Sequence, residues 1–140
     1  MTDANAAKNL PAHGTRPYID FYQQESISPV AQDLTDLSRH FQRREALYRH
    51  LGIVPNLLAG RSVIEFGPGA GHNALYTSSL QPSRYVLVEG NPKAVQESHK
   101  LLAQYSFPDV QHEIVSSLIE EYPGGEQFDV VLCEGVLSWQ

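Results

Sequence analysis

Two glutamates and a short run of glycines are the residues of this sequence best placed to bind a ligand. Glu65 lies near the end of an apolar run, and Gly67, Gly69 and Gly71 follow it in a G-x-G-x-G pattern. Glycines in such a turn let the chain reverse sharply and keep Cβ atoms away from a bound molecule. The segment therefore predicts a nucleotide-like ligand beneath the start of a helix.

Spacing and charge narrow the choice of ligand. The dinucleotide fingerprint G-x-G-x-x-G would require a third glycine where His72 stands. The carboxylate of Glu65 would repel a pyrophosphate but attract a cation. S-adenosylmethionine (SAM) carries a sulfonium and an ammonium group and no phosphate, so the segment fits SAM better than NAD. An NAD(P)-dependent enzyme is the alternative.

Glu89 ends the next apolar run, Tyr85-Val86-Leu87-Val88. A carboxylate at that position can accept hydrogen bonds from both ribose hydroxyls of an adenosine. SAM and NAD sites share this requirement. Glu89 therefore indicates an adenosine-containing ligand without distinguishing the two.

The elements that position these residues alternate between short apolar runs and longer helical patterns. Asn91 and Pro92 are typical of a helix start, as N-cap and first residue. Such alternation implies right-handed crossovers and a parallel sheet, hence a Rossmann-like α/β three-layer sandwich over 59–140. We expect strands over 62–66, 85–88, 110–115 and 128–133 and helices over 72–80 and 91–105.

The N-terminal part of the chain has a different character. Residues 1–17 show no periodicity and predict a flexible tail, and an aromatic and helical segment follows over 18–58. We expect its amphipathic helix to begin at Ser28-Pro29 and to end before Gly52. Its apolar stripe consists of Val30, Leu34, Leu37, Phe41, Tyr48 and Leu51. On the solvated face we expect Arg39, Arg43 and Arg44.

Three aromatic residues precede that helix, namely Tyr18, Phe21 and Tyr22. They could form a lid over the ligand, or they could simply pack on the helix. The sequence leaves both interpretations open.

Three segments taken together resemble a known family. V-I-E-F-G-P-G-A-G-H-N, Y-V-L-V-E-G-N-P and F-D-V-V-L-C-E-G look like motifs I, II and IV of class I SAM-dependent methyltransferases. The resemblance covers roughly residues 60–140. It implies a seven-stranded sheet with the strand order 3-2-1-4-5-7-6, of which this chain would supply strands one to four.

The resemblance also assigns cofactor-binding residues by position. Glu65 would hold the methionine ammonium, and Glu89 would bind the ribose hydroxyls. Many family members have an aspartate after the third strand that meets the adenine amino group, and Ser116 and Ser117 occupy that turn here. The remaining assignments are Gly67, Gly69 and Gly71 beneath the ribose and methionine, Gly90 and Asn91 beside the adenine, and Cys133, Glu134 and Gly135 beside the reactive methyl.

Methyl transfer requires alignment above all, because the sulfonium is already an activated methyl donor. A general base is needed only when the acceptor carries a proton as it attacks. The catalytic residue is not identified by the sequence, and Glu134 and His72 are the candidates. Cys133 is expected to be a buried thiol at a strand end, and the six histidines show no spacing typical of a metal site.

Charge and composition bear on the partners. The formal net charge is −6, which is poorly suited to a phosphate backbone, and the N-P-P-Y signature of nucleic-acid amino-methyltransferases is absent. We therefore expect a small-molecule acceptor and no nucleic acid. No apolar run is long enough to span a bilayer, no signal peptide is visible, and a single cysteine excludes an internal disulfide. These features favour a cytoplasmic protein.

The strand pattern ends at the fourth strand, which would therefore lie at an edge of the sheet. A domain of the usual family size would need roughly 100 further residues. We accordingly expect the chain to be the N-terminal piece of a larger protein, with an edge through which two copies could pair. A non-catalytic nucleotide-binding or interaction module is the remaining alternative.

Overall fold

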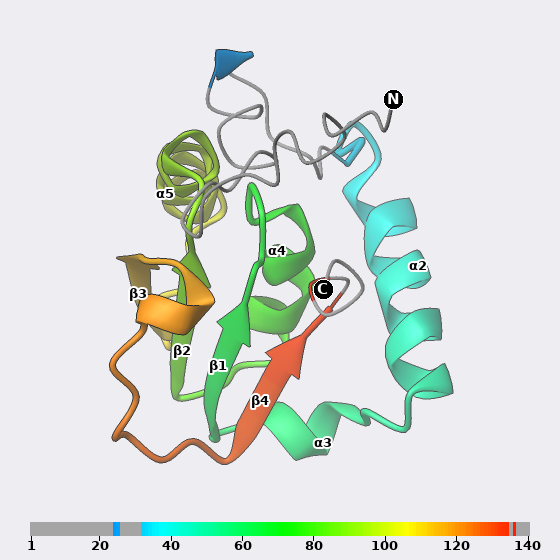
Figure 1. Cartoon of the computed structure of the whole chain (residues 1–140). Helices are drawn as coiled ribbons and strands as arrows, with labels where there is room; N and C mark the ends of the chain where they lie inside the picture. The colour runs from blue at the N-terminus through cyan, green and yellow to red at the C-terminus, as the bar shows by residue number, and fades with distance from the viewer. Residues whose placement is uncertain (1–23, 26–31, 135, 137–140) are drawn as a thin grey trace, which may run out of the picture.

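A four-stranded parallel sheet forms the centre of the chain (Figure 1). The computed structural model describes residues 24–25, 32–134 and 136. The strand order is β3-β2-β1-β4, which confirms the first four positions of the order implied by the resemblance. The strands are β1 (Ser62–Phe66), β2 (Arg84–Glu89), β3 (Gln111–Ser116) and β4 (Val130–Cys133).

The helices lie largely on one face of this sheet. They are α2 (Leu37–His50), α3 (Pro55–Leu58), α4 (His72–Ser79) and α5 (Pro92–Tyr105), with a 3-10 turn η1 (Ile119–Glu121). The main core joins side chains such as Val63 and Leu87 to residues of all four helices. A smaller core on the opposite face contains Ile64, Val86 and Val88, and Tyr122 and Phe128 from the segment before β4 pack against it.

The strand at the edge, β4, differs from the expectation in its burial. Cys133 is exposed rather than buried, and Val131 is 61% exposed. Both side chains lie on the face of the sheet opposite the four helices, as the register Ile64↔Val131 and Phe66↔Cys133 requires. The expectation of a buried thiol was wrong because an edge strand alternates between a covered and an open face.

The start of helix α2 is also corrected. The sequence pattern placed it at Ser28-Pro29, which lie outside the described residues, but the helix begins at Leu37. Asp36 is the N-cap, and its Oδ1 accepts a hydrogen bond from the Arg39 amide at 2.9 Å. The carboxylate of Asp33 accepts from the Thr35 amide at 2.9 Å. Such local hydrogen bonds compete with helix formation, so the residues just before Leu37 form a turn and not a helix.

The buried face of α2 is more polar than the predicted stripe. His40, Arg44 and Tyr48 recur at four-residue spacing and are all buried, whereas Leu51 is 57% exposed. Arg44 is only 6% exposed, so its expected place on the solvated face was wrong. Tyr18, Phe21, Tyr22 and the predicted tail lie outside the described residues.

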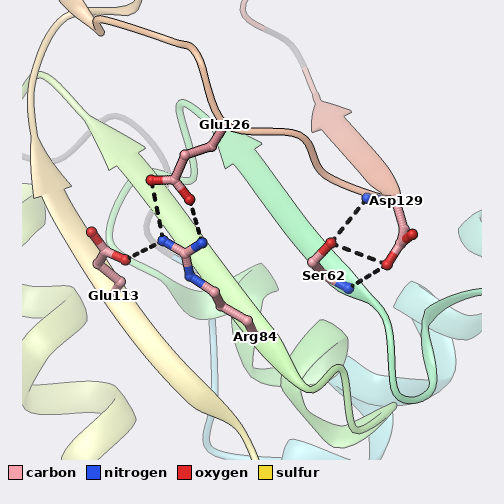
Figure 2. Close-up of polar contacts among 5 residues, drawn as sticks. All are labelled: Ser62, Arg84, Glu113, Glu126 and Asp129. Atoms are coloured by element: carbon pink, nitrogen blue, oxygen red, sulfur yellow. Dashed lines mark hydrogen bonds and ion pairs between the residues drawn. The ribbon is translucent and has the colours of Figure 1, made fainter.

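Polar contacts fix the amino end of the sheet (Figure 2). Asp129, just before β4, accepts hydrogen bonds from the amide and hydroxyl of Ser62 at 2.8 and 3.0 Å. Arg84 bridges Glu113, at 2.7 Å, and Glu126. These ion pairs are partly exposed and contribute little individually. Their arrangement aligns the segment before β4 with β1 and β2.

No helix within the described part of the chain has both the length and the apolar character that crossing a membrane requires.

Candidate functional site

Glu89 connects the ends of the two central strands. Its Oε2 accepts a hydrogen bond from the Gly69 amide at 2.9 Å, and its Oε1 accepts one from the Asn91 amide at 2.8 Å. The carboxylate thus links the loop after β1 to the loop after β2. In parallel sheets of this kind, ligands bind at the carboxyl ends of the strands where the strand order reverses. The order β2-β1-β4 places that reversal at β1.

The glycine loop requires its glycines for conformation and for packing. Gly67, Gly69 and Gly71 have φ values of 70°, 62° and 84°, a region that disfavours side chains. A Cβ on Gly71 would lie 2.9 Å from Ser98 Oγ and 3.3 Å from Ser98 Cα. Ser98 Oγ also donates a hydrogen bond to the Gly69 carbonyl at 3.0 Å. Helix α5 therefore packs directly on the loop and holds it.

Two apolar side chains border the same loops. A Cβ on Gly67 would collide with Val136, and one on Gly90 would lie 2.6 Å from a methyl group of Leu118. Ser116 is opposite Glu89 in the register of β2 and β3 and is exposed. Leu118 therefore contacts Gly90, the residue that the resemblance places beside the adenine. The side chain of Asn91 accepts from the amides of Lys93 and Ala94 and caps α5.

Glu65 is a buried carboxyl group on β1. It is 4% exposed and accepts a hydrogen bond from the Tyr85 hydroxyl. Burial raises its pKa from 4.5 to about 7, against the opposing effects of the Tyr85 hydrogen bond and the positive charge of Arg44. A cation placed nearby would favour the charged form of this group.

Glu134, the glutamate considered as a general base, forms an ion pair. Its Oε1 and Oε2 accept hydrogen bonds from Nη1 and Nη2 of Arg44 at 2.8 and 2.6 Å. The hydrogen bonds from Arg44 lower the pKa of Glu134. A carboxylate with a lowered pKa is a weak proton acceptor and therefore a poor general base. The pair instead joins α2 to the end of β4.

Helix α2 is also tied to α4. The Tyr48 hydroxyl and Thr77 Oγ1 are 2.6 Å apart, and His40 Nε2 donates to the His72 carbonyl at 2.9 Å. The His72 ring accepts a hydrogen bond from the Gln32 amide at 3.4 Å. His72, the other candidate for catalysis, therefore begins α4 and contacts the chain that precedes α2.

An open cleft of about 220 Å³ lies between α2, the start of α4 and the end of β4. Its lining contains two arginines, a histidine and a glutamate. The lining residues are Gln32, His40, Arg43, Arg44, Leu47, Asn73 and Glu134. Within the residues that the structure describes, no group of three His, Cys, Asp or Glu side chains is arranged to hold a metal ion.

Sequence reasoning missed three residues of this region, namely Arg44, Tyr85 and Leu118. Tyr85 could be inferred from register, because it lies next to β1 on the same face as Glu65. The burial of Arg44 depends on an ion pair with Glu134, 90 positions away, which no local sequence pattern indicates. Leu118 lies two residues after β3 and is followed by Ile119, and a pair of apolar residues after a strand is a weak signal for the contact with Gly90.

Several solved structures with a similar fold are methyltransferases. The chain is 19% identical to the Trypanosoma brucei PRMT1 enzyme–prozyme complex with AdoHcy, with a TM-score of 0.56 over 83% of this chain and 33% of that one. Against Arabidopsis thaliana protein arginine methyltransferase 10 the identity is 18% and the TM-score 0.59, over 84% and 31%. Coclaurine N-methyltransferase bound to N-methylheliamine and SAH is 18% identical, with a TM-score of 0.54 over 76% of this chain and 30% of that one.

At such identities the likeness shows the fold. The chain spans about a third of the length of each of these structures. No protein-family model matches the sequence, and no curated protein matches it.

Proposed function

We propose that this chain, which has the fold of the class I SAM-dependent methyltransferases, binds SAM and forms the cofactor-binding part of an enzyme that methylates a small molecule. The observation that carries the proposal is the position of Glu89, whose carboxylate joins the loops after β1 and β2. A ligand that contacts both loops would meet this carboxylate.

Glu89 has the capacity to bind the ribose. An ionised carboxylate has about four lone-pair sites, and the Gly69 and Asn91 amides use two of them. The others can accept from the two ribose hydroxyls. The same amides hold the carboxylate in place before the ligand arrives, which reduces the entropic cost of binding. Leu118, beside Gly90, offers an apolar surface for the adenine.

Glu65 favours a cationic ligand over a dinucleotide. Its burial makes ionisation costly in the unliganded protein, and an ammonium group nearby would offset that cost. A pyrophosphate would increase it. Both SAM and its product S-adenosylhomocysteine carry this ammonium, so Glu65 supports both as ligands.

SAM, once bound, supplies a methyl group on a positively charged sulfur. The protein's contribution is then to orient the acceptor in line with the carbon–sulfur bond and to exclude water. Val136 lies against Gly67 of the glycine loop, and the end of β4 pairs with the end of β1, so both border the place where the methyl group would lie. Because Glu134 is held by Arg44, its carboxylate orients α2 against β4 rather than accepting a proton.

Size and charge support a small acceptor. The cleft beside Glu134 has a volume of about 220 Å³, which is below the usual range of about 300–1,000 Å³ for sites of drug-sized ligands. The net charge of −6 opposes binding to a nucleic-acid backbone.

The variant Glu89→Gln tests the proposal. It keeps the shape of the side chain but removes the charge, so we expect the free energy of S-adenosylhomocysteine binding to weaken by about 2 kcal/mol, or roughly 30-fold in Kd. Equilibrium dialysis measures the change. Glu45→Gln, on the exposed face of α2, is the matched control and should bind as the unmodified chain does. Equal affinity of both variants would contradict the proposed site.

A further inference from the structure

The cleft between α2 and the end of β4 has an excess of positive charge in a negatively charged chain. Arg43 and Arg44 both line it, and Glu134 is its acidic residue. Burial lowers the pKa of the remaining titratable lining residue, His40, which is therefore neutral near pH 7. One positive charge is left uncompensated among the lining residues, whereas the chain as a whole carries −6.

Arg43 provides that charge. Among the residues that the structure describes it has no ion-pair partner, and Asp33 influences it only through longer-range attraction. It follows Arg39 by one helical turn and precedes Arg44 directly. Arg43 is an exposed residue that lines the cleft, so its side chain can turn toward a bound molecule.

Arg44 provides a second, independent indication. Its side chain is 7% exposed, and both of its terminal nitrogens donate to Glu134. Its Nε is buried and has no hydrogen-bond partner in the described part of the chain. An unsatisfied buried donor is costly. Because Arg44 lines the cleft, an acceptor atom bound there would favour a small movement of the side chain that brings its Nε–H to the cleft.

We propose that this cleft binds the methyl acceptor, and that the acceptor is a small acid whose carboxylate or phosphate oxygens lie against Arg43 and, after a small shift of the Arg44 side chain, accept a hydrogen bond from its Nε–H. The assignment rests on the proposed methyltransferase function, because it takes the cleft beside the end of β4 to be next to the reactive methyl. A guanidinium matches both kinds of anion, since its planar N–H groups can pair with two oxygens at once.

A cationic or purely apolar acceptor fits the cleft less well. The acidic residue of the cleft, Glu134, already accepts from Arg44 with both oxygens, so a cation would have to displace a buried arginine. Leu47 is the apolar side chain in the lining, which otherwise consists of polar or charged residues. The side-chain amide of Asn73, at the start of α4, can form hydrogen bonds with an uncharged polar group of the acid.

The test uses the full chain and three simple probes: acetate, inorganic phosphate and methylammonium, at constant ionic strength. Proton–nitrogen NMR spectra follow the Arg44 Nε–H resonance. We expect a saturable shift with acetate, with phosphate or with both, and none with methylammonium. The acetate and phosphate arms distinguish a carboxylic acid from a phosphate ester. In Arg43→Gln the dissociation constant should rise at least fivefold, whereas Arg39→Gln, one turn away and outside the cleft, should leave it unchanged.

Several outcomes overturn the inference. These are the absence of a saturable shift with both anions, a shift with methylammonium alone, or an equal effect of Arg43→Gln and Arg39→Gln. Calorimetry with S-adenosylhomocysteine is run in parallel to separate the two proposals. Binding of S-adenosylhomocysteine without anion binding would contradict only the proposal of an acidic acceptor. Anion binding without S-adenosylhomocysteine binding removes the methyltransferase function, and the acceptor assignment with it.

Discussion

Arg44 in α2 and Glu134 after β4 form a doubly hydrogen-bonded ion pair across 90 positions of the sequence, with distances of 2.8 and 2.6 Å. The arginine is almost fully buried and the glutamate is 42% exposed. The guanidinium also lies 5.1 Å from the centroid of the Tyr48 ring. This pair therefore connects the N-terminal helix to the sheet at the end where the ligand is proposed to bind.

Breaking that ion pair from one side should be costly. In Glu134→Gln the buried guanidinium loses its counter-charge, and we expect the free energy of unfolding to fall by about 2 kcal/mol, less than for a fully buried pair because Glu134 is half-exposed. In Arg44→Met with Glu134→Gln the loss should be smaller, since no buried charge remains. Urea unfolding measures both.

The exposed pair Arg49–Glu45 on the same helix is the control. Glu45→Gln should change stability by no more than about 0.5 kcal/mol. If Glu134→Gln were equally mild, Arg44 would have another partner or would be solvated, and the described pair would not stabilise α2.

The raised pKa of Glu65 predicts a dependence of stability on pH. Between pH 4.5 and about 7 the folded chain retains a proton on Glu65 that the unfolded chain has lost. Stability must therefore fall as pH rises through this interval, by up to about 3 kcal/mol. Glu65→Gln should remove this decrease and be the more stable protein at pH 8. Urea unfolding at pH 5 and pH 8 tests this, and a parallel pH dependence of the two proteins would show that Glu65 is ionised throughout.

The packing of α5 on the glycine loop can be tested with two glycines. Gly71 and Gly60 both have positive φ, 84° and 70°, but only a Cβ on Gly71 would meet neighbouring atoms. Gly60→Ala should cost about 1 kcal/mol for backbone strain alone. Gly71→Ala should cost at least about 2 kcal/mol, because Ser98 must also move. Thermal unfolding compares them; equal costs would mean that α5 does not press on the loop.

Local signals in the sequence were sufficient for the centre of the fold. The apolar run over 62–66 and the cap formed by Asn91 and Pro92 each specify their element without distant partners, and β1 and α5 have the expected bounds. The alternation of strands and helices then leaves little choice but a parallel sheet. The carboxylates Glu65 and Glu89 could be placed because each is at or near the end of its strand.

The errors arose where distant contacts decide the outcome. Arg44 is buried because Glu134 neutralises it, and helix propensity contains no information on that pairing. Cys133 is exposed because it lies on the side of an edge strand away from the four helices. Helix α2 begins at Leu37 after the N-cap Asp36, whereas the sequence pattern favoured Ser28-Pro29, which lie outside the described residues. Several residues that can cap a helix precede α2, and the sequence pattern alone does not determine which of them does so.

The central claim is that the glycine loop and Glu89 bind an adenosine ligand that has an ammonium group and no pyrophosphate. Isothermal titration calorimetry of the chain with S-adenosylhomocysteine and, separately, with NAD tests this claim most directly. We predict saturable binding of S-adenosylhomocysteine at one site and no detectable heat with NAD. Saturable binding of NAD in the absence of S-adenosylhomocysteine binding would contradict the account.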